Sequence, residues 1–127
     1  MNPADLNIES RNLIGGQWVA AATGRAFAVT DPATDREIAQ VPRCGGGETR
    51  QAIEAAQVAL PAWRSRTAED RGAILRTLAD LMKRDRERLA HIMTLEQGKP
   101  LNESRGEINY AASFLDRKST RLNSSHT

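Results

Sequence analysis

The side chains best suited to covalent or metal chemistry, Cys44 and His91, each stand alone in this sequence. Cys44 is the single cysteine among 127 residues and opens the run CGGGE (44–48). A thiol becomes a nucleophile when a nearby base or positive pole lowers its pKa, and the sequence offers nothing obvious beyond Arg43. His91 is isolated from any partner set at metal-ligand spacing. We therefore expect Cys44 to be incidental and His91 to be a surface or boundary residue.

The glycine cluster of CGGGE raises the alternative of a phosphate-binding loop. Such a loop follows a buried strand, and in the Walker pattern it ends in a Lys-Ser or Lys-Thr pair. Here Glu48 and Thr49 follow the glycines. We favour a flexible linker whose end begins a helix, because an isolated glycine cluster mostly marks a loop.

The positive charge of the chain is concentrated in its last segment, DRKSTRLNSSHT (116–127). Lys and Arg number 18 and Asp and Glu 16, and this segment holds three of the former and one of the latter. The remainder is neutral, which gives no electrostatic reason to expect nucleic acid or an anionic membrane as a partner. No apolar stretch is long enough to span a membrane, no signal peptide is evident, and a single cysteine forms no internal disulfide. These features predict a cytoplasmic protein.

Short strands are expected first along the chain, at 13–19, 27–34 and 37–42. Gly15-Gly16 suits a two-residue hairpin turn within the first stretch. Asp31-Pro32 predicts a turn after the second, and Pro42 ends the third. We expect a small meander that lies against another layer.

Three amphipathic helices are expected to follow, over 48–64, 67–97 and from Pro100 to beyond Leu115. Pro61 should kink the first helix or end its regular hydrogen bonding. Thr67 and Asp70 resemble a capping box at the start of the second, and Gly98 suits a left-handed cap at its end. The predicted apolar stripes consist of Ile53, Ala56, Leu60 and Trp63; of Ile74, Leu75, Leu78, Leu81, Met82, Leu89, Ile92 and Met93; and of Leu101, Ile108, Ala111, Ala112 and Leu115.

One surface run, KRDRER (83–88), is basic enough to suggest nucleic acid. Its acidic residues are interleaved with the basic ones, so we interpret it as a solvated helix face.

Taken in order, these segments resemble the N-terminal part of the NAD(P)-dependent aldehyde dehydrogenases. The resemblance rests on LIGGQWV, VTDPAT, EIAQVP, AIEAAQVALPAWRSRTAEDRGAILRTLADLM and MTLEQGKPLNESRGEINYAASFL, which are collinear from about residue 13 to 115. The phrase LEQGKPLNESRGEI followed by YAASFL looks most like the succinate-semialdehyde and glutarate-semialdehyde branch. The resemblance implies an α/β fold in which residues 12–115 are part of the cofactor-binding domain, without its main Rossmann-like sheet.

The family resemblance also implies a mechanism whose chemistry lies elsewhere. In such enzymes a cysteine thiolate attacks the aldehyde, an asparagine holds the oxyanion, hydride passes to the nicotinamide, and a glutamate activates the water that releases the acid. These residues, and the motif that binds NAD or NADP, come later in the family's chain. We therefore expect no catalytic or cofactor-binding residue here, an inactive fragment, and a parent enzyme that forms a dimer or tetramer.

One site residue pair is carried over from the resemblance, namely Thr30 and Glu107. Some family members hold a structural monovalent cation through a backbone carbonyl before the Asn/Asp-Pro turn and a carboxylate early in the third helix. Thr30 and Glu107 match those positions. The alternative is that Glu107 is solvated or pairs with a neighbouring side chain.

Neither end of the chain is expected to have the regular structure of residues 12–115. Residues 1–11 are polar and unpatterned, which predicts a loosely ordered terminus. After Leu115 the family would continue with Glu-Trp-Phe-like residues, whereas this chain has Asp116-Arg117-Lys118. Residues 116–127 look like a translated sequencing adapter, so we expect a non-native or disordered tail. Two rivals stay open: a small module that binds a partner helix along Ile74–Met93, and a nucleic-acid binder that depends on the tail.

Overall fold

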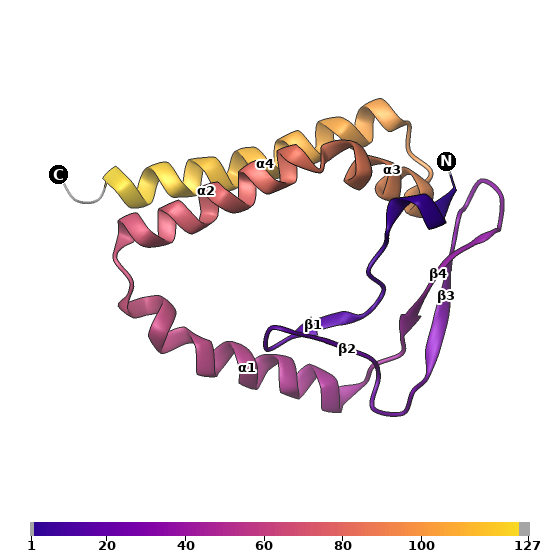
Figure 1. The fold of residues 1–127 in the computed structure, drawn as a ribbon, viewed down its shortest axis with the longest axis horizontal. Coiled ribbons are helices and arrows are strands. Elements are labelled where there is room, and N and C mark those ends of the chain that lie inside the picture. The colour runs from indigo at the N-terminus through magenta and orange to yellow at the C-terminus, as the bar shows by residue number, and fades with distance from the viewer. Residues whose placement is uncertain (1, 125–127) are drawn as a thin grey trace.

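In the computed structural model, residues 2–124 are described, with side chains as far as Lys118. The elements are η1 (Pro3–Leu6), β1 (Asn12–Ile14), β2 (Gln17–Val19), β3 (Ala26–Thr30), β4 (Glu37–Pro42), α1 (Gly46–Ser65), α2 (Ala68–Arg84), α3 (Arg86–Gln97) and α4 (Leu101–Ser124). Helices α2 and α4 lie side by side, whereas α1 runs apart from them near the β1–β2 hairpin (Figure 1). The expected α/β class, with short antiparallel strands before the helices, is confirmed at this level.

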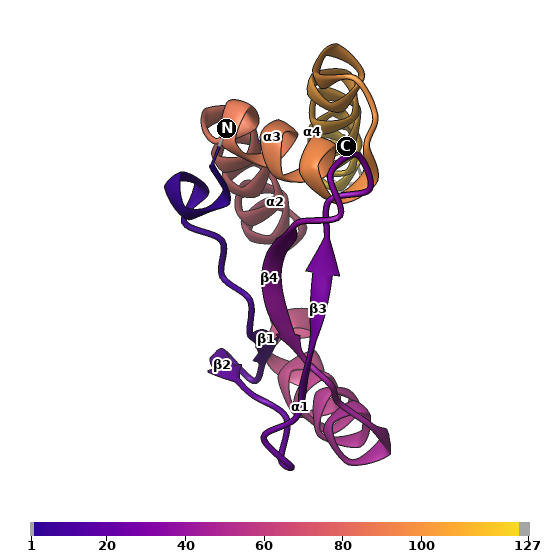
Figure 2. The same ribbon diagram turned by 90° about the vertical axis from the view of Figure 1, so that its right-hand side faces the viewer.

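The strands form two separate hairpins, so the predicted meander is wrong. In the first, Ile14 faces Gln17 across a turn formed by Gly15 and Gly16, whose φ angles of 59° and 79° favour glycine. In the second, β3 pairs with β4 across the loop that begins at Asp31. Figure 2 shows β3 and β4 running side by side, apart from β1 and β2. Each hairpin closes locally, and neither edge is extended by the other.

The helix predicted over residues 67–97 is two helices in the structure. Its start is as expected, because the Asp70 amide donates to the Thr67 hydroxyl at 3.1 Å. Asp85 separates α2 from α3, and its carboxylate accepts from Arg84 Nε at 3.0 Å. The apolar spacing continues across this break, which is why periodicity did not reveal it. Helix α1 continues through Pro61 to Ser65, so Pro61 does not end the helix. The kink expected there stays a prediction.

Within the described residues, both ends of the chain include helical turns, and the expected loose order of residues 1–11 and of the tail stays a prediction. Residues 3–6 form the η1 turn, and Leu6 is only 3% exposed. At the other end, α4 continues to Ser124, and Lys83 Nζ donates to the Asp116 carboxylate at 2.8 Å. The expected disorder of residues 125–127 falls outside the described residues. The non-native origin of residues 116–127 stays a prediction, because a helical backbone says nothing about the source of the codons.

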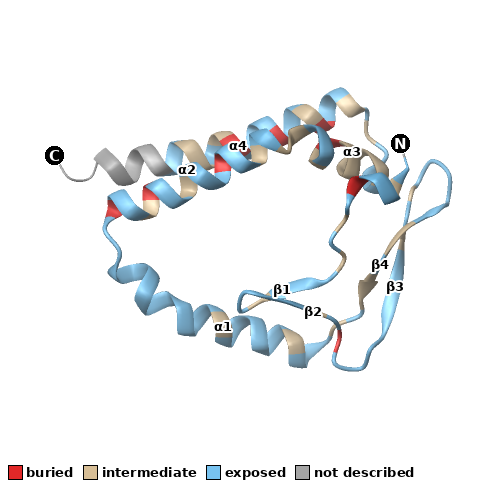
Figure 3. Cartoon of the chain, viewed as in Figure 1, coloured by how far each residue is buried: buried red, intermediate tan, exposed pale blue. Residues whose placement is uncertain are grey.

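Few residues are buried in the described structure, and their positions are scattered over several elements (Figure 3). Most of them are small. Ala79 and Ala112 are fully buried between α2 and α4, and Ser104 is buried where its hydroxyl lies 2.8 Å from that of Thr94. Of the larger aliphatic side chains in the described residues, Leu6 and Ile108 are buried. Small side chains let α2 and α4 approach closely, but they remove little apolar area from water.

Gly98 fixes how α3 joins the rest of the fold. Its φ of 82° forms the left-handed cap of α3, and its amide donates to the Thr94 carbonyl at 2.8 Å. A Cβ at this position would lie 3.0 Å from Pro32 Cγ in the β3–β4 loop. The position therefore requires glycine for both its backbone angle and its close approach to Pro32.

Gly98→Ala is expected to destabilise the chain by about 1–2 kcal/mol, because it places a side chain in a left-handed conformation. Gly106→Ala is the matched control: Gly106 lies within α4 with open space around it, and alanine should stabilise the helix by up to about 1 kcal/mol. Urea unfolding followed by circular dichroism measures both effects. Equal stability of the two variants would contradict this role of Gly98.

Candidate functional site

The predicted cation ligands, Thr30 and Glu107, lie on different elements of the structure. Thr30 ends β3, where it pairs with Glu37 of β4 and is exposed. Glu107 lies in α4, and its Oε1 accepts a hydrogen bond from Lys99 Nζ at 2.5 Å. The ammonium of Lys99 thus already supplies a cation to this carboxylate. This pairing is the alternative that the sequence left open for Glu107.

A hollow of about 460 Å³ lies beside this ion pair, lined by Lys99, Glu103, Gly106, Glu107 and Tyr110. Within the described residues, no group of three or more His, Cys, Asp or Glu side chains is placed to hold a metal ion. A monovalent ion held by one carboxylate and backbone carbonyls does not need such a group. The role of Thr30 and Glu107 therefore stays a prediction.

Cys44 is half-buried between β4 and α1. Its sulfur accepts a hydrogen bond from Asn12 Nδ2 at 3.2 Å. Arg43, the one neighbouring cation in sequence, places its guanidinium over the Phe27 ring, 5.3 Å from the centroid. The carboxylate closest in the chain, Glu48, lines the same hollow of about 310 Å³.

Glu48 serves as a cap for α1 rather than as a base for Cys44. Its carboxylate accepts from the Gly45 and Ala22 amides, both at 2.8 Å. These backbone hydrogen bonds, that from Gly45 first, lower the pKa of Glu48 below its usual value. A carboxylate with a lowered pKa is a weaker base, and it also offsets the positive pole of α1 that would favour a thiolate. The interpretation of Cys44 as incidental stays a prediction.

The same capping interaction bears on the phosphate-loop alternative for CGGGE. A phosphate at a helix N-terminus would occupy the position that the Glu48 carboxylate fills, and it would carry the same sign of charge. The glycines around Gly45 therefore do not fit a dinucleotide phosphate. They form the start of α1, as the linker interpretation predicted.

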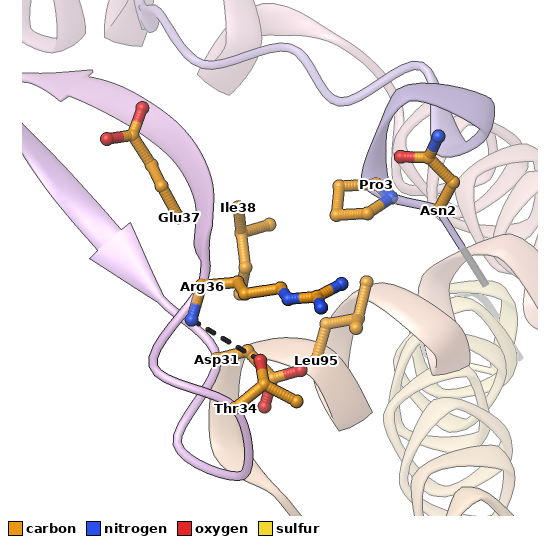
Figure 4. Close-up of a pocket in the computed structure, with 8 residues that line it drawn as sticks. All are labelled: Asn2, Pro3, Asp31, Thr34, Arg36, Glu37, Ile38 and Leu95. Carbon is orange, nitrogen blue, oxygen red and sulfur yellow. Dashed lines mark hydrogen bonds between the residues drawn. The ribbon is translucent and has the colours of Figure 1, made fainter.

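A cleft of about 570 Å³ lies between η1, the β3–β4 loop and α3, and the sequence did not indicate it. It is lined by Asn2, Pro3, Asp31, Thr34, Arg36, Glu37, Ile38 and Leu95. Figure 4 shows the Arg36 guanidinium extending between Pro3 and Leu95, while the Glu37 carboxylate points away. Asp31 and Thr34 are engaged in their own loop, where they accept from the amides of Ala33 and Arg36.

The side chains that line this cleft include one cation, two carboxylates, one hydroxyl and one amide. The Thr34 hydroxyl accepts the Arg36 amide at 3.3 Å and has no basic partner among the eight lining residues. The cleft is assembled by segments distant in sequence, so no local motif marks it. It is a polar surface hollow rather than a catalytic site.

The remaining residues singled out in the sequence have structural partners. His91 Nδ1 lies 2.7 Å from the Glu87 carbonyl, within its own helix. In the basic run, Glu87 receives three hydrogen bonds from Arg105 of α4. Nε donates to Oε1 at 2.9 Å and to Oε2 at 3.2 Å, and Nη2 donates to Oε2 at 3.0 Å. Arg105 lowers the pKa of Glu87. The run therefore joins α3 to α4 through paired charges, and the expectation that it is not a nucleic-acid surface stays a prediction.

Comparison with known proteins identifies the family. The model of the family described as "Aldehyde dehydrogenase family" matches residues 18–126. Over 104 residues the chain is 53% identical to the NADP(+)-dependent succinate-semialdehyde dehydrogenase of Escherichia coli K12, covering 82% of this chain and 22% of that protein. Over 103 residues it is 53% identical to glutarate-semialdehyde dehydrogenase of Pseudomonas putida KT2440, covering 81% and 22%.

A solved structure supports the same assignment. A betaine aldehyde dehydrogenase variant from Staphylococcus aureus, in complex with NAD+, superposes with a TM-score of 0.87 at 30% identity, covering 91% of this chain and 24% of that one. The chain belongs to the aldehyde dehydrogenase family, and its resemblance to that family is confirmed. It spans about a fifth of the length of the curated relatives it matches. Among the described residues, no helix combines the length and hydropathy of a membrane span.

The cap on α1 predicts a pH-dependent contribution to folding. Because the pKa of Glu48 is lowered in the folded chain, its stabilisation is complete above the unfolded value of 4.5 and is lost as the pH falls through the lower folded value. We expect the Ala22 and Gly45 amide resonances to shift with a midpoint below pH 4.5, measured by NMR titration.

Glu48→Gln should abolish this shift, whereas the control Glu54→Gln, on the same helix, should retain it. A midpoint at or above pH 4.5, or the same shift in Glu48→Gln, would contradict the capping role.

Proposed function

We propose that this chain is the N-terminal portion of the cofactor-binding domain of an NAD(P)-dependent aldehyde dehydrogenase. The parent enzyme oxidises succinate semialdehyde, or a similar ω-carboxy aldehyde, to the acid. The observation that carries the proposal is the 53% identity, over most of this chain, to dehydrogenases of succinate and glutarate semialdehydes. We also infer a cytoplasmic homo-oligomer for the parent, as the resemblance implied.

The chemistry of the reaction is assigned to the rest of the parent chain. Cys44, the sole cysteine of the sequence, is hydrogen-bonded to Asn12 and lies beside a carboxylate of lowered pKa. The start of α1 does not fit a dinucleotide phosphate, because Glu48 fills it. We therefore infer that the cysteine nucleophile, the glutamate, the oxyanion-holding asparagine and the NAD or NADP site lie outside residues 12–115. On this account the isolated chain is inactive.

The contribution of this portion is positional. The α2–α4 pair and the bidentate Glu87–Arg105 interaction hold α2, α3 and α4 in one arrangement. In an enzyme of this kind such a layer supports the elements that carry the reacting groups, and small displacements of a support reduce the rate of reaction.

A segment exchange tests the proposed branch of the family. Residues 13–115 would replace the matching segment of the E. coli succinate-semialdehyde dehydrogenase and, in parallel, that of the S. aureus betaine aldehyde dehydrogenase. The first chimera should retain kcat/KM for succinate semialdehyde within about tenfold, or about 1.4 kcal/mol. The second should lose far more towards its own substrate, because 30% identity leaves more contacts mismatched.

Cys44→Ala in the first chimera is the control for the thiol, and NADPH formation should be unchanged. Loss of turnover in a folded Cys44→Ala chimera would assign chemistry to this residue. A folded but inactive first chimera, or equal activity of both chimeras, would refute the proposed branch.

We propose further that Thr30 and Glu107 contribute to a monovalent cation site in the parent. In the first chimera, Glu107→Gln should reduce the rise in melting temperature that sodium or potassium gives over choline at equal ionic strength. Glu103→Gln, one turn earlier in α4, is the matched control and should keep the wild-type rise. A cation effect that survives Glu107→Gln would leave Glu107 as the ion-pair partner of Lys99 alone.

A further inference from the structure

The described fold leaves more surface exposed than a chain of its size ordinarily does. Its accessible area is 8934 Å². A compact monomer of the same mass exposes about 6,700 Å², so the excess is about 2,200 Å². A standard protein–protein interface buries about 800 Å² on each partner, so this excess has the scale of an obligate contact.

Two stripes of exposed apolar side chains lie on this surface. The α1 stripe consists of Ile53, Leu60 and Trp63, which are 55%, 51% and 37% exposed, and no residue of α1 is buried. The α2 stripe consists of Ile74, Leu78 and Leu81, which are 41–45% exposed. Both follow helical spacing, so each places its side chains along one side of its helix.

The β1–β2 hairpin extends the apolar surface next to α1. Leu13 and Trp18 face each other across the strands and are 59% and 48% exposed. The hairpin contacts α1, and Gly15 approaches Ala55 closely enough for an added Cβ to lie 3.7 Å from that residue's Cβ. Exposed tryptophans beside aliphatic residues are typical of the anchors of a protein interface.

The comparisons indicate what covers such a surface. The same arrangement of elements occurs in the S. aureus structure, where it makes up 24% of the chain. In the E. coli relative the matching segment makes up 22%. About three-quarters of each of those proteins therefore lies outside the segment that matches this chain. A polypeptide of that size is large enough to bury about 2,000 Å² of this chain's surface.

Building on the proposed function, we propose that this chain binds the remainder of a semialdehyde dehydrogenase non-covalently, through the α1 and α2 stripes. The two polypeptides then assemble as one dehydrogenase subunit. The chain outside residues 116–127 is electrically neutral, so the association is driven by apolar burial and should be nearly independent of salt.

The test uses the chimera of residues 13–115 with the E. coli enzyme, carrying a specific protease site after residue 115. After cleavage, the two pieces should co-elute in gel filtration and retain activity. The pieces are then separated in urea, and the 127-residue chain is added to the remainder during refolding. We expect activity at least about tenfold above that of the remainder refolded alone.

Ile53→Asp and Leu78→Asp should each weaken the recovery about tenfold or more, because a charge is desolvated at the contact. Gln51→Asp, on the same helix but facing away from the α1 stripe, is the matched control and should leave it unchanged. Circular dichroism of each variant chain checks that these exposed substitutions preserve its helices.

The possible results distinguish the binding proposal from the proposed function. Separation of the cut pieces while the uncut chimera is active would overturn the binding proposal and leave the proposed function intact. An inactive uncut chimera whose pieces nevertheless stay together would refute the proposed function alone. Equal recovery with Ile53→Asp and Gln51→Asp would overturn the assignment to the stripes, as would association of the chain with itself in place of the remainder.

Discussion

The contact between α2 and α4 is the constraint on which the described structure depends. It is formed by small side chains such as Ala79 and Ala112, which permit close packing over a long distance but bury little apolar area. The larger apolar side chains of α1 and α2 remain open to solvent. A fold held by such contacts has a specific geometry but little hydrophobic stabilisation of its own. These are the properties expected of a segment that packs against the rest of a larger protein.

Electrostatic contacts position the smaller elements around this pair. Glu48 ties the chain at Ala22 to the start of α1, and Glu87 with Arg105 ties α3 to α4. Glu87 is exposed, whereas Glu48 and Arg105 are half-buried. Solvent still reaches these groups, so the contacts set direction and register more than they add stability. Cys44 and the glycine run, whose residue types suit chemistry, are engaged in structural contacts: Cys44 accepts from Asn12, and the Gly45 amide donates to Glu48. This is why the function is assigned to the family's remaining chain rather than to these residues.

Local signals in the sequence predicted the parts of the fold that are determined locally. Gly15-Gly16, the Thr67 cap and the left-handed Gly98 each fix a backbone angle or a hydrogen bond within a few residues. The break at Asp85 escaped notice because apolar spacing continues across it. The pairing of β3 with β4 alone, and the cleft around Arg36, depend on segments distant in the chain, which periodicity does not report. In the candidate site, the expectation that Cys44 is incidental stays a prediction. The Lys99–Glu107 ion pair joins residues eight apart in the sequence, and no motif marks it.

Hydrogen exchange of the 127-residue chain tests the central claim, that this layer lacks the surface against which α1 packs. Amides in helices without buried side chains open locally at low cost, whereas packed helices open at higher cost. The account predicts that α1 amides exchange much faster than those at the centres of α2 and α4. Protection of α1 equal to that of α2 and α4, in the monomeric chain, would contradict it.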